Sequence, residues 1–313
     1  MTPRSLLITG VSGYIGGTVL SSILKTQDQW TEQLKISALV RTKFQATTVQ
    51  NLGVLPVMFS SFDETEVLEK IAGKFDIIIH AGAGWHTSSA KALITGQGAR
   101  RAALNRPVHY IQISGTSNLS DRPHTDGYTG THQFNDEEDI FSYEKYRESR
   151  EAYCQRMTDI TVIETGEALG ATTYVVMAPT IYGEGSGPFN RYSIQLPAMI
   201  AEAIKSGVHS CMDSQIPSGR KGIYFCETGK HSHRKLLERL VKAAYELGVL
   251  LTAEVKSITL QEVGDKLALG SILRAELSFG ANADWETTFH TEVKAFVKKP
   301  PRERDLPQFL KKD

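Results

Sequence analysis

The sequence predicts an α/β protein built on a doubly wound parallel sheet, followed by a smaller, mostly helical lobe. Three observations lead to this fold class. Segments of strand character alternate with segments of helical spacing as far as Met177. Residues 75–80 are dominated by an apolar run, which is typical of parallel strands buried on both faces. A glycine-rich turn separates the first predicted strand from the first predicted helix.

The predicted strands and helices follow one another in order along the first part of the chain. Strands are expected at Leu6–Thr9, Lys35–Val40, Val54–Phe59, Phe75–His80, Val108–Ile113 and Thr173–Met177. Helices are expected at Tyr14–Lys25, Glu64–Ala72 and Ser88–Asn105, and as one helix between about Asp139 and Leu169.

A change of character after Pro179 marks the predicted domain boundary. Glycines and a proline favour a loop at residues 183–188. We therefore assign residues 1–183 to the first domain and residues 184–313 to a smaller lobe, which begins with a helix from about Leu196 to Ser206. Two later stretches repeat apolar residues at helical spacing and are interpreted as core: Leu236, Leu237, Leu240, Val241, Ala244 and Leu247, then Phe289, Val293, Phe296 and Val297.

Composition and charge exclude several classes of function. The chain carries 35 basic and 35 acidic side chains, so it lacks the net positive charge that favours nucleic-acid binding. No segment approaches the ~20 apolar residues of a membrane span, and the first apolar run is too short for a signal peptide. We expect a cytoplasmic protein without a membrane partner. The three cysteines lie far apart and His231-Ser232-His233 lacks a third ligand, so no metal site is expected.

The turn after the first strand has the pattern of a dinucleotide-binding loop. Gly10 permits a tight turn, Gly13 lets the backbone approach a pyrophosphate, and Gly16 allows close packing of helix and strand. N–H groups at the helix N-terminus would bind the phosphates. We predict that residues 1–183 form a Rossmann-type NAD(P)-binding domain and that residues 184–313 bind the substrate. The predicted cofactor contacts in the loop are Thr9, Gly10, Ser12, Gly13, Tyr14, Ile15 and Gly16.

The end of the second strand favours NADP(H) over NAD(H). An acidic residue at this place would bind the hydroxyls of the adenine ribose. The chain instead has Arg41, then Thr42 and Lys43, and the cations Arg41 and Lys43 with the Thr42 hydroxyl suit a 2′-phosphate. The alternative is that Arg41 is an ordinary surface cation.

Four blocks of sequence, at residues 9–16, 76–83, 113–117 and 179–183, make the chain resemble the extended short-chain dehydrogenase/reductase family, the NAD(P)-dependent epimerase/dehydratase-like proteins. The blocks occur in the family's order, and the chain's overall character is similar to that of fungal members. The resemblance implies a Ser/Thr catalytic position at Thr116. It further implies cofactor contacts at Phe62 and Asp63 near the adenine, at Ala81, Gly82 and Ala83 near the ribose, and at Pro179, Thr180 and Ile181 beside the nicotinamide.

The chain departs from the family at its catalytic pair. The family uses a tyrosine and, four residues later, a lysine that lowers the tyrosine pKa and holds the ribose. This sequence has no Tyr-x-x-x-Lys, although Tyr143 and Arg147 have that spacing. With the loop lengths usual in the family, counting forward from Thr116 places the catalytic tyrosine near Tyr143. Counting backward from the last predicted strand instead places the pair at Glu151 and Gln155. We predict Thr116, Tyr143 and Arg147 as catalytic residues, with loss of the pair as the alternative.

The second lobe is predicted to be truncated relative to the family. Only Val208–Lys221 lies where the family has a further strand and the start of a helix, and this linker is short and polar. Such a deletion would open the substrate pocket and expose sheet edges, which invite a partner strand. A homodimer is therefore one expected arrangement.

Three functions follow from these patterns. The leading hypothesis is an NADP(H)-binding oxidoreductase or epimerase-like enzyme that acts on a small carbonyl or hydroxyl compound, with Thr116 and Tyr143 polarising the substrate oxygen. The second is a non-redox regulator or sensor that binds the dinucleotide, which the missing Tyr-x-x-x-Lys favours. The third is a non-redox isomerase or cyclase that reuses the same pocket, because the fold does not fix the chemistry.

Overall fold

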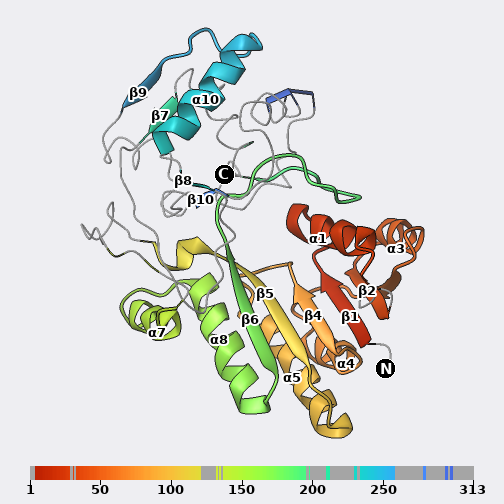
Figure 1. The fold of residues 1–313 in the computed structure, drawn as a ribbon. Helices are drawn as coiled ribbons and strands as arrows, with labels where there is room; N and C mark the ends of the chain where they lie inside the picture. The colour runs from red at the N-terminus through yellow and green to blue at the C-terminus, as the bar shows by residue number, and fades with distance from the viewer. Residues whose placement is uncertain are drawn as a thin grey trace.

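A six-stranded parallel sheet forms the centre of the computed structural model of the chain (Figure 1). The structure describes residues 4–28, 33–120, 137–194 and 233–257, and residues 31, 132, 134, 197, 209–211, 229–230, 278–279, 293–294 and 297–298. The strands of the sheet are β1 (Arg4–Thr9), β2 (Leu34–Val40), β3 (Leu55–Met58), β4 (Ile77–His80), β5 (His109–Gly115) and β6 (Thr172–Ala178). They lie within two residues of the predicted strands.

The strand order is β3-β2-β1-β4-β5-β6, which confirms the predicted doubly wound sheet. The chain extends the sheet from β1 in one direction through β2 and β3, and then in the other direction from β4 onwards. β1 therefore pairs in parallel with both β2 and β4, and Thr9 lies opposite His80. Open parallel sheets bind ligands beyond the carboxyl ends of their strands at such a reversal. The glycine-rich turn follows β1 at this place.

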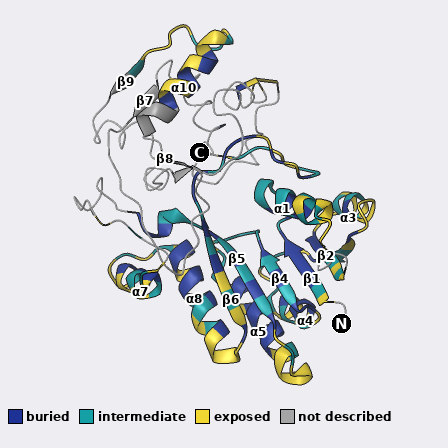
Figure 2. Ribbon diagram, in the orientation of Figure 1, coloured by how far each residue is buried: buried dark blue, intermediate teal, exposed yellow. Residues whose placement is uncertain are grey.

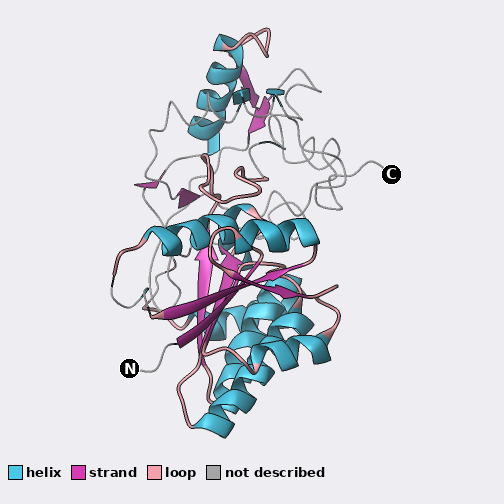
Figure 3. Ribbon diagram, turned by 90° about the vertical axis from the view of Figure 1, so that its right-hand side faces the viewer, coloured by secondary structure: helices cyan, strands magenta, loops and turns pink. Residues whose placement is uncertain are grey.

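Helices cover both faces of the sheet (Figure 3). On one face, α1 (Tyr14–Lys25) and α3 (Lys43–Gln50) contact β1, β2 and β3. The other layer contains α4 (Thr65–Ala72), α5 (Thr87–Leu104) and α8 (Cys154–Leu169), and α7 (Ile140–Arg150) lies against α8. The helices expected at 14–25, 64–72 and 88–105 agree with α1, α4 and α5 to within one residue.

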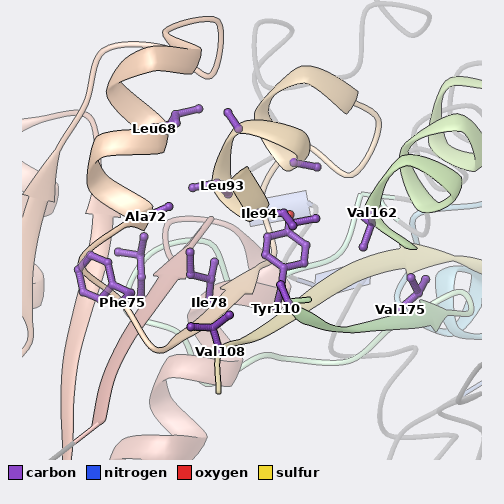
Figure 4. Packing of buried hydrophobic residues seen from close by; sticks show 14 of the residues in the cluster. Leu68, Ala72, Phe75, Ile78, Leu93, Ile94, Val108, Tyr110, Val162 and Val175 are labelled. Atoms are coloured by element: carbon purple, nitrogen blue, oxygen red, sulfur yellow. The ribbon is translucent and has the colours of Figure 1, made fainter. Parts of the chain in front are cut away.

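The apolar core is divided between the two faces of the sheet. Leu7 of β1 belongs to the cluster under α4, α5 and α8, whereas its neighbours Leu6 and Ile8 belong to the cluster under α1. This alternation follows from the pleat of a strand. Figure 4 shows part of the larger cluster, which includes the fully buried side chains of Ile78 and Tyr110. The buried residues line the inside of the domain, and exposed positions follow the outer sides of the helices (Figure 2).

Helix α3 is absent from the elements that the sequence pattern predicts. Its only buried residue is Val49, so no apolar stripe marks it. The helix is instead started by a capping box, in which the Thr42 side chain accepts from the Gln45 N–H and the Gln45 side chain accepts from the Thr42 N–H. The spacing of Thr42 and Gln45 was the available sequence signal.

The single helix expected between Asp139 and Leu169 is wrong, because the structure forms two helices there. α7 ends at Arg150 and α8 begins at Cys154. Between them, Glu151 and Tyr153 have extended backbones, with φ of −151° and −142°. Tyr153 therefore lies outside both helices, and α8 packs beside β5 and β6 of the sheet.

The described part of the later chain includes α10 (His233–Glu246) and four short strands. β7 (His209–Cys211) pairs with β9 (Val255–Ser257), and β8 (Gly229–Lys230) pairs with β10 (Ser278–Phe279). α10 buries Leu237, Leu240, Val241 and Ala244, as its apolar stripe predicts. Of the final predicted stripe, Val293 is buried and Val297 is exposed, which contradicts a core role for Val297.

Several expected segments lie largely outside the described residues. Of the helix at about 196–206 only Pro197 is described, of the short linker at 208–221 only β7 at residues 209–211, and of the His231-Ser232-His233 segment only His233. Among the described residues, none of the helices has both the length and the apolar character that crossing a bilayer requires.

Candidate functional site

The glycine-rich turn forms a tight cradle between β1 and α1. Gly10 has a φ of +70°, and a Cβ there would lie 2.5 Å from the Ala81 carbonyl oxygen. A Cβ on Gly16 would collide with the Gly10 carbonyl. Gly13 precedes α1, and no side chain caps the helix N-terminus at that position. The cradle therefore leaves first-turn N–H groups without a capping side chain, and such groups bind phosphates.

The end of β4 is fastened directly to the end of β1. The Thr9 hydroxyl lies 2.8 Å from Nδ1 of His80, and both residues are fully buried. Burial lowers the pKa of His80 to about 3, so its ring is neutral at neutral pH. The following Gly82 lies against the Gly10 backbone, where a Cβ would be 3.2 Å from the Gly10 nitrogen. Ala83 then adopts a φ of +58°, a left-handed conformation that is uncommon for alanine.

The loop after β6 lies over the start of α1, where it is drawn in green in Figure 1. The Tyr14 hydroxyl donates to the Gly183 carbonyl at 2.8 Å, and the Asn190 N–H donates to the Ser12 carbonyl at 3.4 Å. A Cβ on Gly187 would lie 2.9 Å from the Gly17 Cα. The predicted loop at 183–188 thus packs against the cradle.

Of the three residues expected beside the nicotinamide, Pro179 and Thr180 are buried and Ile181 is half-buried. The Thr180 hydroxyl oxygen has no hydrogen-bond partner within the part of the chain that the structure describes. A buried hydroxyl in this state is suited to a polar group of a ligand.

Arg41 follows β2 on an exposed stretch at the start of α3. The Gln45 side chain accepts from the N–H groups of Arg41 at 2.8 Å and Thr42 at 3.3 Å. Those backbone donors are therefore already used, and an anion at this place would bind the side chains of Arg41 and Lys43 instead. The segment from Arg41 to Phe44 contains no carboxylate.

Phe62 and Asp63 differ in their surroundings. The Phe62 ring packs edge-on against the His80 ring, with centroids 5.4 Å apart. Asp63 is exposed, and its carboxylate accepts from the Ser61 hydroxyl at 2.6 Å and contacts Nε2 of His86 at 3.0 Å. The hydrogen bond from Ser61, followed by that from His86, lowers the pKa of Asp63.

The structure brings Tyr143 and Arg147 together on α7. Arg147 donates from Nη1 to the Tyr143 hydroxyl at 3.1 Å and from Nη2 to the Ser120 carbonyl at 3.0 Å. The Tyr143 ring packs against Phe134, with centroids 4.6 Å apart. These contacts tie α7 to the segment after β5.

Thr116 lies at the carboxyl end of β5, and a different tyrosine reaches the residue next to it. Thr116 begins a 3₁₀ turn, η1 (Thr116–Asn118). The Ser117 hydroxyl lies 3.2 Å from the Tyr153 hydroxyl and donates to Oε1 of Gln155 at 2.9 Å. The forward count from Thr116 missed this group, whereas the backward count ended on Gln155. Tyr153 reaches Ser117 because the chain breaks between α7 and α8, and the apolar periodicity of the sequence does not predict that break.

A buried polar network holds η1 from below. The Asp159 carboxylate accepts from the Ser114 hydroxyl and from the Asn118 amide, which also donates to Glu144 at 3.2 Å. Burial raises the pKa of Asp159 to about 8, and burial together with Asp159 raises that of Glu144 well above its usual value. Arg156 donates from Nε to the Asn118 carbonyl at 2.8 Å. The network thereby fixes the backbone that carries Thr116 and Ser117.

We expect Asp159→Asn to flatten the pH dependence of stability. The folded protein keeps a proton on Asp159 up to about pH 8, because burial raises its pKa, whereas the unfolded chain releases it near pH 3.8, the ordinary pKa of an aspartate. The stabilising contribution of protonated Asp159 to the free energy of unfolding is therefore fully present below about pH 4, and it is lost as the pH rises towards 8. Urea unfolding across this range should show a falling stability in the wild type and a smaller fall in the variant.

Asp139→Asn is the matched control for this experiment. Asp139 is an N-cap carboxylate whose pKa is lowered by its hydrogen bonds to Ser142, so its titration affects stability only in acid. The control should keep the wild-type slope between about pH 5 and pH 8. An unchanged slope in Asp159→Asn would show that the buried carboxyl is ionised in the folded protein.

Known proteins are similar to this chain in sequence or in structure, at low sequence identity. No protein-family model matches the chain. The oxidase ucsJ of Acremonium sp. is 22% identical over 304 residues, which cover 83% of this chain and 84% of that protein. Vestitone reductase from alfalfa superposes with a TM-score of 0.51 and 14% identity, covering 95% of this chain and 99% of its own.

A third similar protein is the enzyme WbmH of Bordetella bronchiseptica, whose structure was determined in complex with NAD+. It superposes with a TM-score of 0.56 at 10% identity and covers 95% of this chain and 100% of its own. The four sequence blocks, the strand order and these superpositions agree, and the chain has the fold of the extended short-chain dehydrogenases/reductases.

Proposed function

We propose that the protein is an NADP(H)-dependent oxidoreductase that acts on a small carbonyl or hydroxyl compound. The observation that carries the proposal is the cradle at the reversal of strand order, where Gly10 and Gly16 admit no Cβ and the α1 N-terminus has no capping side chain. These features suit a pyrophosphate. Similarity to reductases and to an NAD+ complex supports the same ligand class.

The described residues fit the two ends of such a cofactor. At the adenine end, the side chains of Arg41 and Lys43 would hold a 2′-phosphate. The backbone N–H groups of Arg41 and Thr42 would not, because they already donate to the Gln45 side chain. The buried Thr180 hydroxyl would face the nicotinamide end. A bound nicotinamide supplies or accepts a hydride. The chain itself must orient the substrate oxygen, and Thr116 at the end of β5 is our candidate for that hydrogen bond.

The proposed function is tested by binding and turnover with the purified chain. NADPH fluorescence should report saturable binding, and NADPH absorbance should decline in the presence of members of a panel of aliphatic and aromatic aldehydes and ketones. Binding without any turnover would favour the dinucleotide-binding sensor, which the missing Tyr-x-x-x-Lys also favours. Substrate isomerisation or cyclisation without net oxidation of NADPH would favour the isomerase or cyclase.

We expect Arg41→Ala to raise the Kd for NADPH by about 10- to 100-fold, because a charge-assisted hydrogen bond contributes roughly 1.5–3 kcal/mol. The Kd for NADH, which lacks the 2′-phosphate, should not change. Fluorescence titration with both dinucleotides measures the difference. Lys25→Ala is the control, since Lys25 is an exposed cation at the far end of α1. Equal weakening of NADPH and NADH would argue against a 2′-phosphate site at Arg41.

A further inference from the structure

The loop after β6 closes on itself. The Gly185 N–H donates to the Arg191 carbonyl at 2.7 Å, and Nε of Arg191 donates to the Gly185 carbonyl at 2.8 Å. The same guanidinium lies 3.2 Å from the Glu184 carboxylate. Residues 185–191 therefore form a compact loop, here called the closed loop, and its one cation is already paired with an acid.

The closed loop is fastened both to α1 and to the glycine-rich turn before it. The Ser21 hydroxyl, in the second half of α1, donates to the Ser186 carbonyl at 2.8 Å. The Asn190 N–H donates to the carbonyl of Ser12, in the turn itself, at 3.4 Å. The closed loop therefore extends along α1 and ends beside the cradle, at Asn190 (Figure 1).

Phe189 brings the same end of the closed loop to α3. Its ring packs edge-on against the ring of Phe44, with centroids 6.1 Å apart, and it also contacts the apolar cluster under α1. Phe44 comes directly after Lys43 and three residues after Arg41, the two cations that suit a 2′-phosphate. Asn190 follows Phe189 in the chain. It therefore lies where the glycine-rich turn and the start of α3 approach each other.

The side chain of Asn190 offers a hydrogen-bond donor at this place. Its Oδ1 accepts from the Tyr192 N–H at 3.3 Å, which fixes the orientation of the amide and leaves Nδ2 as the donor. Nδ2 makes no hydrogen bond within the part of the chain that the structure describes, and the residue is exposed. Residues 41–44 and 185–194 contain no carboxylate. An anion between these two segments would meet donors and cations from both.

We propose that Asn190 determines specificity for the 2′-phosphate of NADP(H), through a hydrogen bond from Nδ2 to the phosphate that the side chains of Arg41 and Lys43 bind. The proposal rests on the proposed NADP(H)-dependent function. A phosphate group has three strong acceptor oxygens, so it accepts from several donors at once. The two cations come from the segment after β2, whereas the amide comes from the loop after β6. The phosphate therefore joins two segments that are far apart in the sequence.

The first test compares ligands with and without the 2′-phosphate, using the full chain and no turnover. Asn190→Ala should raise the Kd for NADPH and for adenosine 2′,5′-bisphosphate by about 10-fold, as expected for one lost hydrogen bond to a charged group. The Kd for NADH and for AMP should not change. Isothermal titration calorimetry measures all four constants. Asn51→Ala, at the exposed far end of α3, is the matched control and should keep the wild-type values.

Asn190→Asp separates the donor from the structure of the closed loop. The variant keeps an oxygen that accepts from the Tyr192 N–H, but it replaces the donor with a negative charge. Because like charges in contact cost several kcal/mol, the Kd for NADPH should rise by about 100-fold or more. The Kd for NADH and the Tm of the unliganded protein should stay at their wild-type values.

The outcomes separate this proposal from the proposed function. Equal weakening of NADPH and NADH in Asn190→Ala, or wild-type affinity for NADPH in Asn190→Asp, would overturn the role of Asn190. If Arg41→Ala weakens NADPH alone while both Asn190 variants bind it as the wild type does, the role of Asn190 fails and the proposed cofactor stands. If the wild type binds adenosine 2′,5′-bisphosphate no more tightly than AMP, the preference for NADP(H) fails, and the role of Asn190 fails with it.

Discussion

Gly10→Ala should lower the free energy of unfolding by about 3 kcal/mol and abolish measurable binding of the dinucleotide. A left-handed backbone costs a non-glycine residue roughly 1–2 kcal/mol, and crowding of a packed site adds about 1–3 kcal/mol. Both terms apply, because Gly10 has a φ of +70° and its Cβ would lie 2.5 Å from the Ala81 carbonyl oxygen. Urea unfolding and NADPH fluorescence measure the two effects.

Gly53→Ala separates the two contributions. Gly53 has a φ of +78°, but nothing lies within 4 Å of a Cβ placed there. This control should therefore lose only about 1–2 kcal/mol of stability and keep wild-type NADPH binding. If Gly10→Ala were no less stable than Gly53→Ala and still bound NADPH, close approach of the Ala81 carbonyl would not be what requires glycine in the cradle.

The second large effect is expected at Arg156. Arg156→Met should lower the free energy of unfolding by about 3–5 kcal/mol, because it leaves buried charged and polar partners uncompensated. The guanidinium is 1% exposed, and it donates to the carbonyls of Asn118 and Glu151 and contacts Glu148 at 3.3 Å. Denaturant unfolding should show the loss. Proteolysis near η1 should also become faster, because the carbonyl of Asn118 loses its donor.

Arg150→Met is the matched control for this substitution. Arg150 is an exposed arginine at the end of α7, and its guanidinium lies 4.8 Å from the centre of the exposed Tyr146 ring. Surface changes of this kind are usually within about 0.5 kcal/mol. A loss of similar size in both variants would mean that the buried contacts of Arg156 contribute no more than surface ones.

The fold could be predicted because the spacing of apolar residues and the positions of glycines are each readable from a short stretch of sequence. The apolar stripe of α1 and the run before His80 each identify an element without reference to the rest of the chain. The cradle could be predicted for the same reason, since Gly10 and Gly16 are required by contacts with the residues that follow β4 and with the turn itself.

The surroundings of Thr116 could not be predicted in the same way. At the helix break, Glu151–Tyr153, two side chains bind the backbone five residues away: the Glu148 carboxylate accepts from the Tyr153 N–H, and Arg156 donates to the Glu151 carbonyl. These polar contacts leave no apolar periodicity in the sequence. Sequence spacing therefore led to Tyr143, whereas the residue that reaches Ser117 comes from an extended segment. Helix α3 was not predicted because it has no stripe of apolar residues. It begins at a capping box formed by Thr42 and Gln45.

The loop after β6 contacts α1, the first helix of the chain. The hydrogen bonds from Tyr14 to Gly183 and from Ser21 to Ser186 join residues 169 and 165 positions apart. During synthesis, these two contacts can form only after β6 and the residues that follow it have left the ribosome. A dinucleotide that binds the folded chain would, at 100 times its Kd, stabilise it by about 2.7 kcal/mol. The lifetime of the protein in a cell should therefore follow the supply of its cofactor, whether or not substrate is present.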